Sequence, residues 1–226
     1  MTISRLLKTA LRRHKPSIRA RGRVIQRFAK KLGLVYLGVV DQHVDEHEVI
    51  RGLTVSTTHQ DTHYAVGSYD GLDISIVDRF DIIQDHTGHS AEHSWVIMQL
   101  DLHTAESLPH VFFKPLNHSQ QSYDKFFNAY HHLQAVNPML DPAHSGEFHG
   151  RYELYTVPAR ALELEQVLTP AITNTIAARL WPHAIEIFEN KLYLYTTDTA
   201  LNSTLLEAGI ESAMWLARVL SQESEA

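Results

Sequence analysis

Residues 64–78, YAVGSYDGLDISIVD, contain the pattern that decides the fold class. Two runs of largely β-branched and aromatic residues, 64–66 and 72–78, flank the pair Asp70-Gly71. An Asp-Gly pair between two such runs is typical of a two-residue β-hairpin turn, because both turn positions need a positive φ angle. The stretch therefore predicts two antiparallel strands joined by a tight turn.

Further strands are expected outside this hairpin, over residues 34–40, 94–102, 111–114, 148–157, 184–188 and 191–196. The last two runs predict a second hairpin across Glu189-Asn190. The polar segment 84–93 is the expected loop before the strand at 94–102. Four carboxylates alternate through and after the first hairpin and are expected on one solvated face: Asp70, Asp73, Asp78 and Asp81.

Helices are predicted where apolar residues recur every three or four positions, over residues 3–11, 17–32, 119–136, 159–180 and 205–220. Pro16 separates the first two, Gly33 ends the second, and Pro170 kinks or divides the fourth. Asn202 or Ser203 caps the last. No strand–helix–strand alternation runs through the chain. We therefore predict an α+β fold, with an antiparallel or mixed sheet and packed helices, preceded by a basic N-terminal helical arm.

The charges are distributed very unevenly along the chain. Residues 1–31 hold 11 of the 20 lysines and arginines, and the first acidic residue is Asp41. The remaining residues hold 9 cations and all 26 acids, a net charge of −17. This asymmetry predicts a basic amphipathic arm over residues 1–32 joined to an acidic α+β domain over residues 33–226.

The composition excludes several classes of protein. With no cysteine, the chain has no disulfide framework, no thiolate metal site and no cysteine nucleophile. It contains neither a G-x-S-x-G elbow nor a glycine-rich phosphate loop. No apolar run approaches the roughly 18 to 20 residues of a membrane span, and no secretory signal is recognisable. We expect a cytoplasmic protein that associates peripherally with a membrane or with another protein.

A series of short motifs gives a family resemblance. Phe28-Ala29 precede Gly33, a hydrophobic strand pair surrounds residues 71–78, a strand ends at Leu108-Pro109, and a segment rich in Phe and Tyr at 148–168 leads into a helix. In this order the motifs resemble a loosely defined group of uncharacterised bacterial proteins, a domain of unknown function, over residues 28–220. The resemblance implies a similar layout of elements, and it carries over no activity and no functional residue.

Histidine supplies the candidate metal ligands, because the chain contains 16 histidines, several of them closely spaced. The clustered residues are His43 and His47, His59 and His63, and His86, His89 and His93. Three imidazoles with a nearby carboxylate suit Zn²⁺, Ni²⁺ or Cu²⁺. The H-x-x-E-H pattern at 43–47 matches one zinc-peptidase class but lacks helical apolar spacing. A metal-dependent enzyme is therefore the alternative hypothesis, beside a hydrophilic surface that uses histidine freely.

The basic arm is the stronger functional candidate. Its predicted contact residues are Arg5, Leu6, Leu7, Lys8, Leu11, Arg12 and Arg13. On a membrane, the leucines would enter the acyl boundary while the cations meet lipid phosphates. The same residues suit a protein partner or a second copy of the chain, and an arginine-rich start is also typical of transit peptides. A nucleic-acid partner is disfavoured, since Phe28 is the only aromatic residue of the arm. We expect a non-enzymatic binding or scaffold protein that uses this arm.

Overall fold

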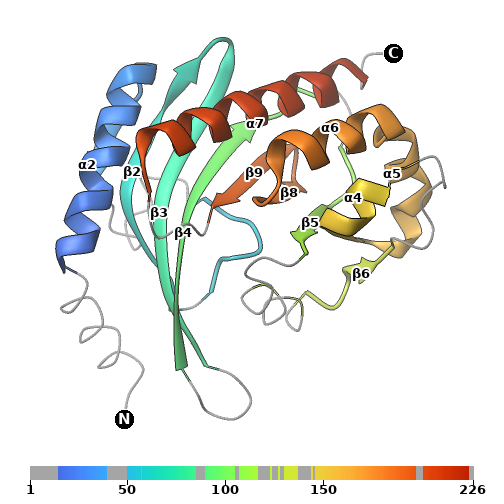
Figure 1. The fold of residues 1–226 in the computed structure, drawn as a ribbon, viewed down its shortest axis with the longest axis horizontal. Coiled ribbons are helices and arrows are strands. Elements are labelled where there is room, and N and C mark those ends of the chain that lie inside the picture. The colour runs from blue at the N-terminus through green and yellow to red at the C-terminus, as the bar shows by residue number, and fades with distance from the viewer. Residues whose placement is uncertain are drawn as a thin grey trace. The chain divides into compact units, whose positions relative to one another are not determined.

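The computed structural model describes residues 15–39, 50–56, 58–84, 90–104, 107–116, 123, 127, 130–136, 144, 146–196 and 201–223. They form an α+β fold of helices and antiparallel strands, as the sequence predicts (Figure 1). They divide into two compact units. The first draws on the described residues of segments 1–51, 55–98 and 196–208, and the second on those of segments 52–54, 99–195 and 209–226. Among the described residues, no helix combines the length and the apolar composition needed to cross a lipid bilayer.

The first unit contains the predicted hairpin. Its neighbouring strands are, in order, β1 (Val35–Gly38), β2 (Gln60–Tyr69), β3 (Leu72–Gln84) and most of β4 (Ser90–Asp101). β2 and β3 pair antiparallel, with Tyr69 opposite Leu72. The turn residues Asp70 and Gly71 have φ angles of 52° and 81°. The Asp-Gly hairpin is therefore confirmed, and both of its strands are longer than the sequence predicts.

Strand β1 stands at the end of this strand order, paired on one side with β2. Its register shifts between Tyr36 and Gly38, and Gly38 has a φ angle of 73°. Val35 and Leu37 point their side chains outward and are 59% and 40% exposed. β1 is thus a short, irregular edge strand with an apolar outer surface.

Helix α2 (Lys15–Leu32) lies beside β2 (Figure 1). It contacts both β1 and β2, and its buried residues form an apolar stripe. Ile25, Phe28 and Ala29 in this stripe are at most 1% exposed. The helix begins one residue before Pro16, which lies in the first turn, where a missing N–H leaves no hydrogen bond unmade. Gly33 follows the helix with a φ angle of 75°, as expected for a helix stop.

Helix α2 and strand β2 approach each other closely at Gly22. A Cβ atom placed at Gly22 would lie 2.7 Å from the ring nitrogens of His63. The same ring is held from the other side, because its Nδ1 is 2.7 Å from the hydroxyl oxygen of Tyr36 in β1. Next to Gly22, Arg21 Nη2 forms an ion pair with Asp78 Oδ1 of β3 at 2.7 Å. Gly22 therefore allows the helix to pack directly against an imidazole ring.

The second unit contains a second set of antiparallel strands. In order, its neighbours are β9 (Lys191–Thr196, of which Thr196 belongs to the first unit), β8 (Ala184–Phe188), β5 (Val111–Pro115), β7 (Tyr152–Thr156) and β6 (Gln134–Ala135). Its helices are α4 (Gly146–Arg151), the 3₁₀ turn η2 (Pro158–Arg160), α5 (Ala161–Val167) and α6 (Pro170–Leu180). Helix α7 (Ser203–Glu223) begins in the first unit and continues in the second from Gly209.

Several local signals of the sequence are confirmed in the second half of the chain. β8 and β9 form the predicted hairpin, and its turn residues Glu189 and Asn190 have φ angles of 51° and 57°. Pro170 divides the long predicted helix, since α6 begins at this proline. The side-chain Oδ1 of Asn202 accepts the backbone N–H of Leu205 at 2.9 Å, so Asn202 is the cap of α7.

Three predicted boundaries are wrong. The predicted loop 84–93 is shorter, because β3 runs to Gln84 and β4 begins at Ser90. The predicted helix 119–136 does not reach its end, since residues 134–135 form β6 and pair with β7. The first four residues of the predicted strand 148–157 belong to α4, where Phe148 is buried and Arg151 forms an ion pair with Glu147 at 2.8 Å.

The carboxylates of the first hairpin do not share one solvated face. Asp70 and Asp73 are exposed, whereas Asp78 and Asp81 are 5% and 1% exposed. Asp78 is neutralised by Arg21, and Asp81 accepts hydrogen bonds from Ser56 Oγ at 2.6 Å and from Thr58 Oγ1 at 2.8 Å. The prediction is wrong here because distant segments supply partners that make burial of a carboxylate tolerable.

We expect Gly22→Ala to lower the free energy of unfolding by about 1–3 kcal/mol, the usual cost of overpacking a tight contact. The added methyl group must displace the His63 ring and break its hydrogen bond to Tyr36. Urea denaturation followed by circular dichroism measures this loss.

The matched control is Gly150→Ala, at another helical glycine, where an added Cβ meets no atom within 4 Å. This change should be neutral or should stabilise the protein by up to about 1 kcal/mol, since alanine is the better helix former. Equal effects of the two substitutions would contradict the tight packing of α2 on His63.

Candidate functional site: the cationic face of helix α2

The exposed side of α2 carries four cations in a row, Arg19, Arg23, Arg27 and Lys30. Their spacing of four, four and three residues places them on one helix face over roughly 17 Å, at 1.5 Å of rise per residue. α2 contains no acidic residue. In the part of the chain that the structure describes, none of the four forms an ion pair or a side-chain hydrogen bond. We call these four residues the cationic face.

Other cations of α2 serve the fold. The Arg21 side chain is 11% exposed and grips Asp78 with both Nε and Nη2. Lys31 Nζ reaches Glu207 Oε2 of α7 at 2.9 Å, with the two side chains 62% and 34% exposed. An ion pair this open to solvent contributes at most about 1 kcal/mol. The cationic face thus differs from Arg21 and Lys31 in having no acidic partner among the residues that the structure describes.

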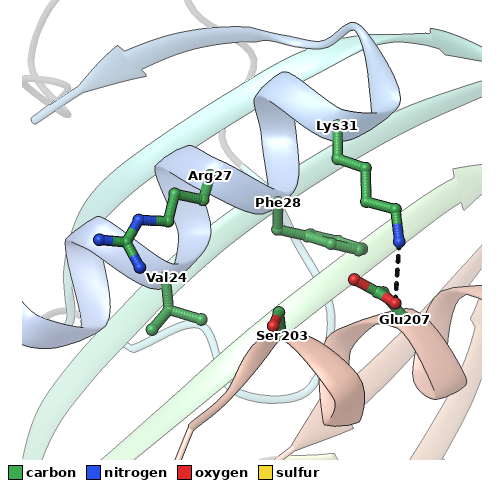
Figure 2. Close-up of a pocket in the computed structure, with 6 residues that line it drawn as sticks. All are labelled: Val24, Arg27, Phe28, Lys31, Ser203 and Glu207. Carbon is green, nitrogen blue, oxygen red and sulfur yellow. Dashed lines mark ion pairs between the residues drawn. The ribbon is translucent and has the colours of Figure 1, made fainter.

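A pocket of about 210 Å³ lies beside the cationic face, between α2 and the start of α7 (Figure 2). It is lined by Val24, Arg27, Phe28, Lys31, Ser203 and Glu207. In Figure 2 the Phe28 ring points toward α7, and the Arg27 guanidinium points away from the ion pair of Lys31 and Glu207. Ligand pockets usually measure roughly 300–1,000 Å³. The hollow is too small for a substrate of ordinary size, so the chemistry available here is that of surface charge.

Of the predicted metal ligands, His63 is committed to the packing of α2. Burial, and secondarily the charge of Asp78, raise the pKa of Tyr36, so its hydroxyl keeps its proton. This hydroxyl and His63 Nδ1 are hydrogen-bonded to each other at 2.7 Å. That nitrogen is therefore occupied within the fold.

His59 lies in a buried polar network of the first unit. Its Nδ1 contacts the backbone of Ser56, and its Nε2 is 4.0 Å from Asp61 Oδ2. Asp61 is itself held by the fully buried Arg79, with Nε–Oδ1 and Nη2–Oδ2 distances of 2.7 Å. Burial, followed by the positive charge of Arg79, lowers the pKa of His59. His59 is therefore a neutral member of a structural network.

The remaining predicted ligands do not complete a metal site in the described residues. The ring of His93 stacks on Trp95 with a centroid distance of 5.6 Å. His43, His47, His86 and His89 lie outside the described residues. Within those residues no group of three or more histidine or carboxylate side chains is placed to hold a metal ion. The metal hypothesis for these clusters stays a prediction.

The arm residues named from the sequence, Arg5, Leu6, Leu7, Lys8, Leu11, Arg12 and Arg13, also lie outside the described residues. Sequence reasoning did not select the cationic face itself, although its signal was present. The four-residue spacing of Arg19, Arg23 and Arg27 marks one helix face, and the apolar stripe of Ile25, Phe28 and Ala29 marks the opposite one. The division into an arm of residues 1–32 and a domain of residues 33–226 stays a prediction.

Comparison with known proteins gives a likeness of fold. No protein-family model and no curated protein matches the sequence. The crystal structure of the mycobacterial trehalose monomycolate transport factor A, TtfA, is similar, with a TM-score of 0.58 and 12% sequence identity over 89% of this chain and 95% of that chain. At this identity the similarity shows a shared fold, and it transfers no functional residue.

The lowered pKa of His59 predicts a loss of stability in acid. The unfolded chain binds a proton on this imidazole near its ordinary pKa of 6.5, whereas the folded chain does so only at lower pH. The free energy of unfolding should therefore fall as the pH drops through 6.5 and level off below the folded pKa. His59→Gln should show a smaller decrease than the wild type in urea denaturation between about pH 7.5 and pH 5.

His103→Gln is the control, because His103 is an exposed histidine outside the network. It should leave the pH dependence close to that of the wild type. If His59→Gln and the wild type lose stability in parallel, the protonation of His59 is not coupled to folding.

Proposed function

We propose that this chain is a non-enzymatic binding protein that associates with an anionic membrane surface through the cationic face of α2 and the basic arm before it. The observation that carries the proposal is the row of Arg19, Arg23, Arg27 and Lys30, exposed and without acidic partners in the described residues. A row of cations on one helix face has the opposite charge to a surface of lipid phosphates and is attracted to it.

The expected strength is that of reversible association. Each Lys or Arg near an anionic leaflet contributes about 1 kcal/mol, so four contribute about 4 kcal/mol at low ionic strength. The apolar stripe of α2 is buried in the fold and adds nothing to membrane insertion. Further affinity must come from the arm, where Leu6, Leu7 and Leu11 are the predicted inserting residues.

The charge of the rest of the chain restricts how the protein can approach a membrane. The residues after position 31 carry a net charge of −17, which anionic lipids repel. Attraction by the cationic face acts over a Debye length of about 8 Å at physiological salt. Binding therefore requires the cationic face to meet the lipid surface directly, and it should weaken steeply with salt.

The similar fold of TtfA supports a role without catalysis, since that protein is named as a transport factor and not as an enzyme. The alternative of a metal-dependent enzyme built on the predicted histidine clusters stays a hypothesis. Four of its seven predicted ligands lie outside the described residues, and His59 and His63 have structural partners.

The proposal predicts that Arg23→Glu combined with Arg27→Glu abolishes binding to anionic vesicles. The full chain should co-sediment with vesicles containing phosphatidylserine at low ionic strength and should be released at roughly 0.5 M salt. The double reversal removes two attractive charges and adds two repulsive ones. Apparent affinity should fall by about 2–4 kcal/mol, or roughly 30- to 1,000-fold.

The control is Arg51→Glu combined with Arg179→Glu, which changes the net charge equally at exposed positions outside α2. This variant should bind vesicles nearly as well as the wild type. If the wild type does not co-sediment at low salt, the membrane role is wrong, and an acidic protein partner becomes the preferred hypothesis.

A further inference from the structure

A buried carboxylate in the second unit has hydrogen-bond partners from three separate segments. Glu186 of β8 is fully buried, and its Oε2 accepts the backbone N–H of Leu53 at 2.7 Å and the hydroxyl of Tyr195. Its Oε1 is 2.7 Å from His110 Nε2. The chain passes so close to Glu186 that a Cβ at Gly52 would lie 2.9 Å from Oε2. Both carboxylate oxygens therefore have hydrogen-bond partners, and the partner of Oε1 is His110.

No arginine or lysine of the described residues forms an ion pair with Glu186, and His110 is its ion-pair partner there. A carboxylate buried without a cation is costly. When Glu186 is ionised, its carboxylate only accepts hydrogen bonds, and His110 Nε2 then carries the proton that is donated to Oε1. The lone pair of the neutral ring is then on Nδ1. His110 Nδ1 is therefore the ring nitrogen that is available to a metal ion.

A second imidazole stands at this position. His132 Nε2 lies 3.3 Å from His110 Nδ1. Two nitrogens bound to one tetrahedral Zn²⁺ at about 2.0–2.1 Å are themselves about 3.3–3.4 Å apart, so this separation suits two ligands of the same ion. His132 is exposed, whereas His110 is 8% exposed, so an ion between them would be reached from solvent.

The His110 ring is also fixed by aromatic neighbours. Its centroid is 4.5 Å from that of Phe188, and Tyr130 meets it edge-on at 6.3 Å. A histidine that binds metal through one nitrogen usually donates its other N–H to a carboxylate, which fixes the ring and raises its basicity. The three residues have this arrangement, with the carboxylate of Glu186 in the interior, then His110, and then His132 at the surface.

We propose that His110 and His132 bind a divalent transition metal ion of the Zn²⁺, Ni²⁺ or Cu²⁺ class, with Glu186 as the carboxylate that orients His110. Within the described residues, no third histidine or carboxylate is placed to coordinate the same ion. The site is separate from the histidine clusters picked out in the sequence. It does not depend on membrane binding, because none of its residues belongs to α2.

Copper binding to the full chain tests the proposal, because Cu²⁺ binds such ligands most tightly and its paramagnetic resonance spectrum counts coordinated nitrogens. Other histidines also take up metal, so the comparison is between His132→Ala and the adjacent His131→Ala. His131 is exposed as well, and the structure gives it no part in the pair. We expect His132→Ala to lose the tight binding of one copper ion per chain.

In calorimetry the affinity for this ion should be about tenfold or more weaker, and the paramagnetic resonance spectrum should lose the coupling to one nitrogen. His131→Ala should match the wild type. Equal binding by the two variants overturns the site.

The role of Glu186 is tested without a variant, so no folding defect can interfere. In the metal-free protein at about pH 8, nitrogen NMR should show His110 with its proton on Nε2 and a bare Nδ1. On addition of Zn²⁺, the Nδ1 resonance of His110 should shift. The Nε2 nitrogen should remain protonated. A ring protonated on Nδ1, or one unaffected by Zn²⁺, would overturn the assignment of Glu186 and His110.

Discussion

The packing of α2 on β1 and β2 is the contact on which the first unit depends. Gly22 allows the helix to reach the His63 ring, and Phe28 and Ala29 bury the apolar stripe. Because 3.6 residues make a turn, the stripe that faces the sheet forces the residues between its members to face solvent. The solvent-facing residues include Arg19, Arg23, Arg27 and Lys30. The burial that stabilises the first unit thus also exposes the row of charge from which the proposed function follows.

The parts of the fold that the sequence predicted are those with local causes. Asp70-Gly71 and Glu189-Asn190 adopt the positive φ angles that a two-residue hairpin turn requires, and Pro170 divides a helix by its own covalent structure. The errors occur where a distant partner decides. Residues 134–135 are a strand because β7 lies beside them, and Asp78 is buried because Arg21, 57 positions away, neutralises it. Periodicity contains no information on either partner.

The candidate sites likewise divide into features with a local cause in the sequence and features that depend on distant residues. The spacing of Arg19, Arg23 and Arg27 is visible in the sequence, because a helix converts spacing directly into a face. Histidines that are close in sequence do not come together in this way. His63 lies in β2 and His59 just before it, and each has its own hydrogen-bond partners. The pair that does meet, His110 and His132, is 22 residues apart, and Glu186 is 76 residues from His110. No sequence pattern marks a contact between separate strands and a turn.

The edge strand β1 has a bearing on the solubility of the protein. An exposed strand edge offers free backbone groups to any extended segment, and Val35 and Leu37 would make such a pairing apolar as well. The strand is only four residues long, and its register breaks between Tyr36 and Gly38. A strand that added to β1 could form only a few consecutive backbone hydrogen bonds, because the bulge interrupts the regular pairing. The irregular register of β1 therefore disfavours the addition of a further strand along this edge.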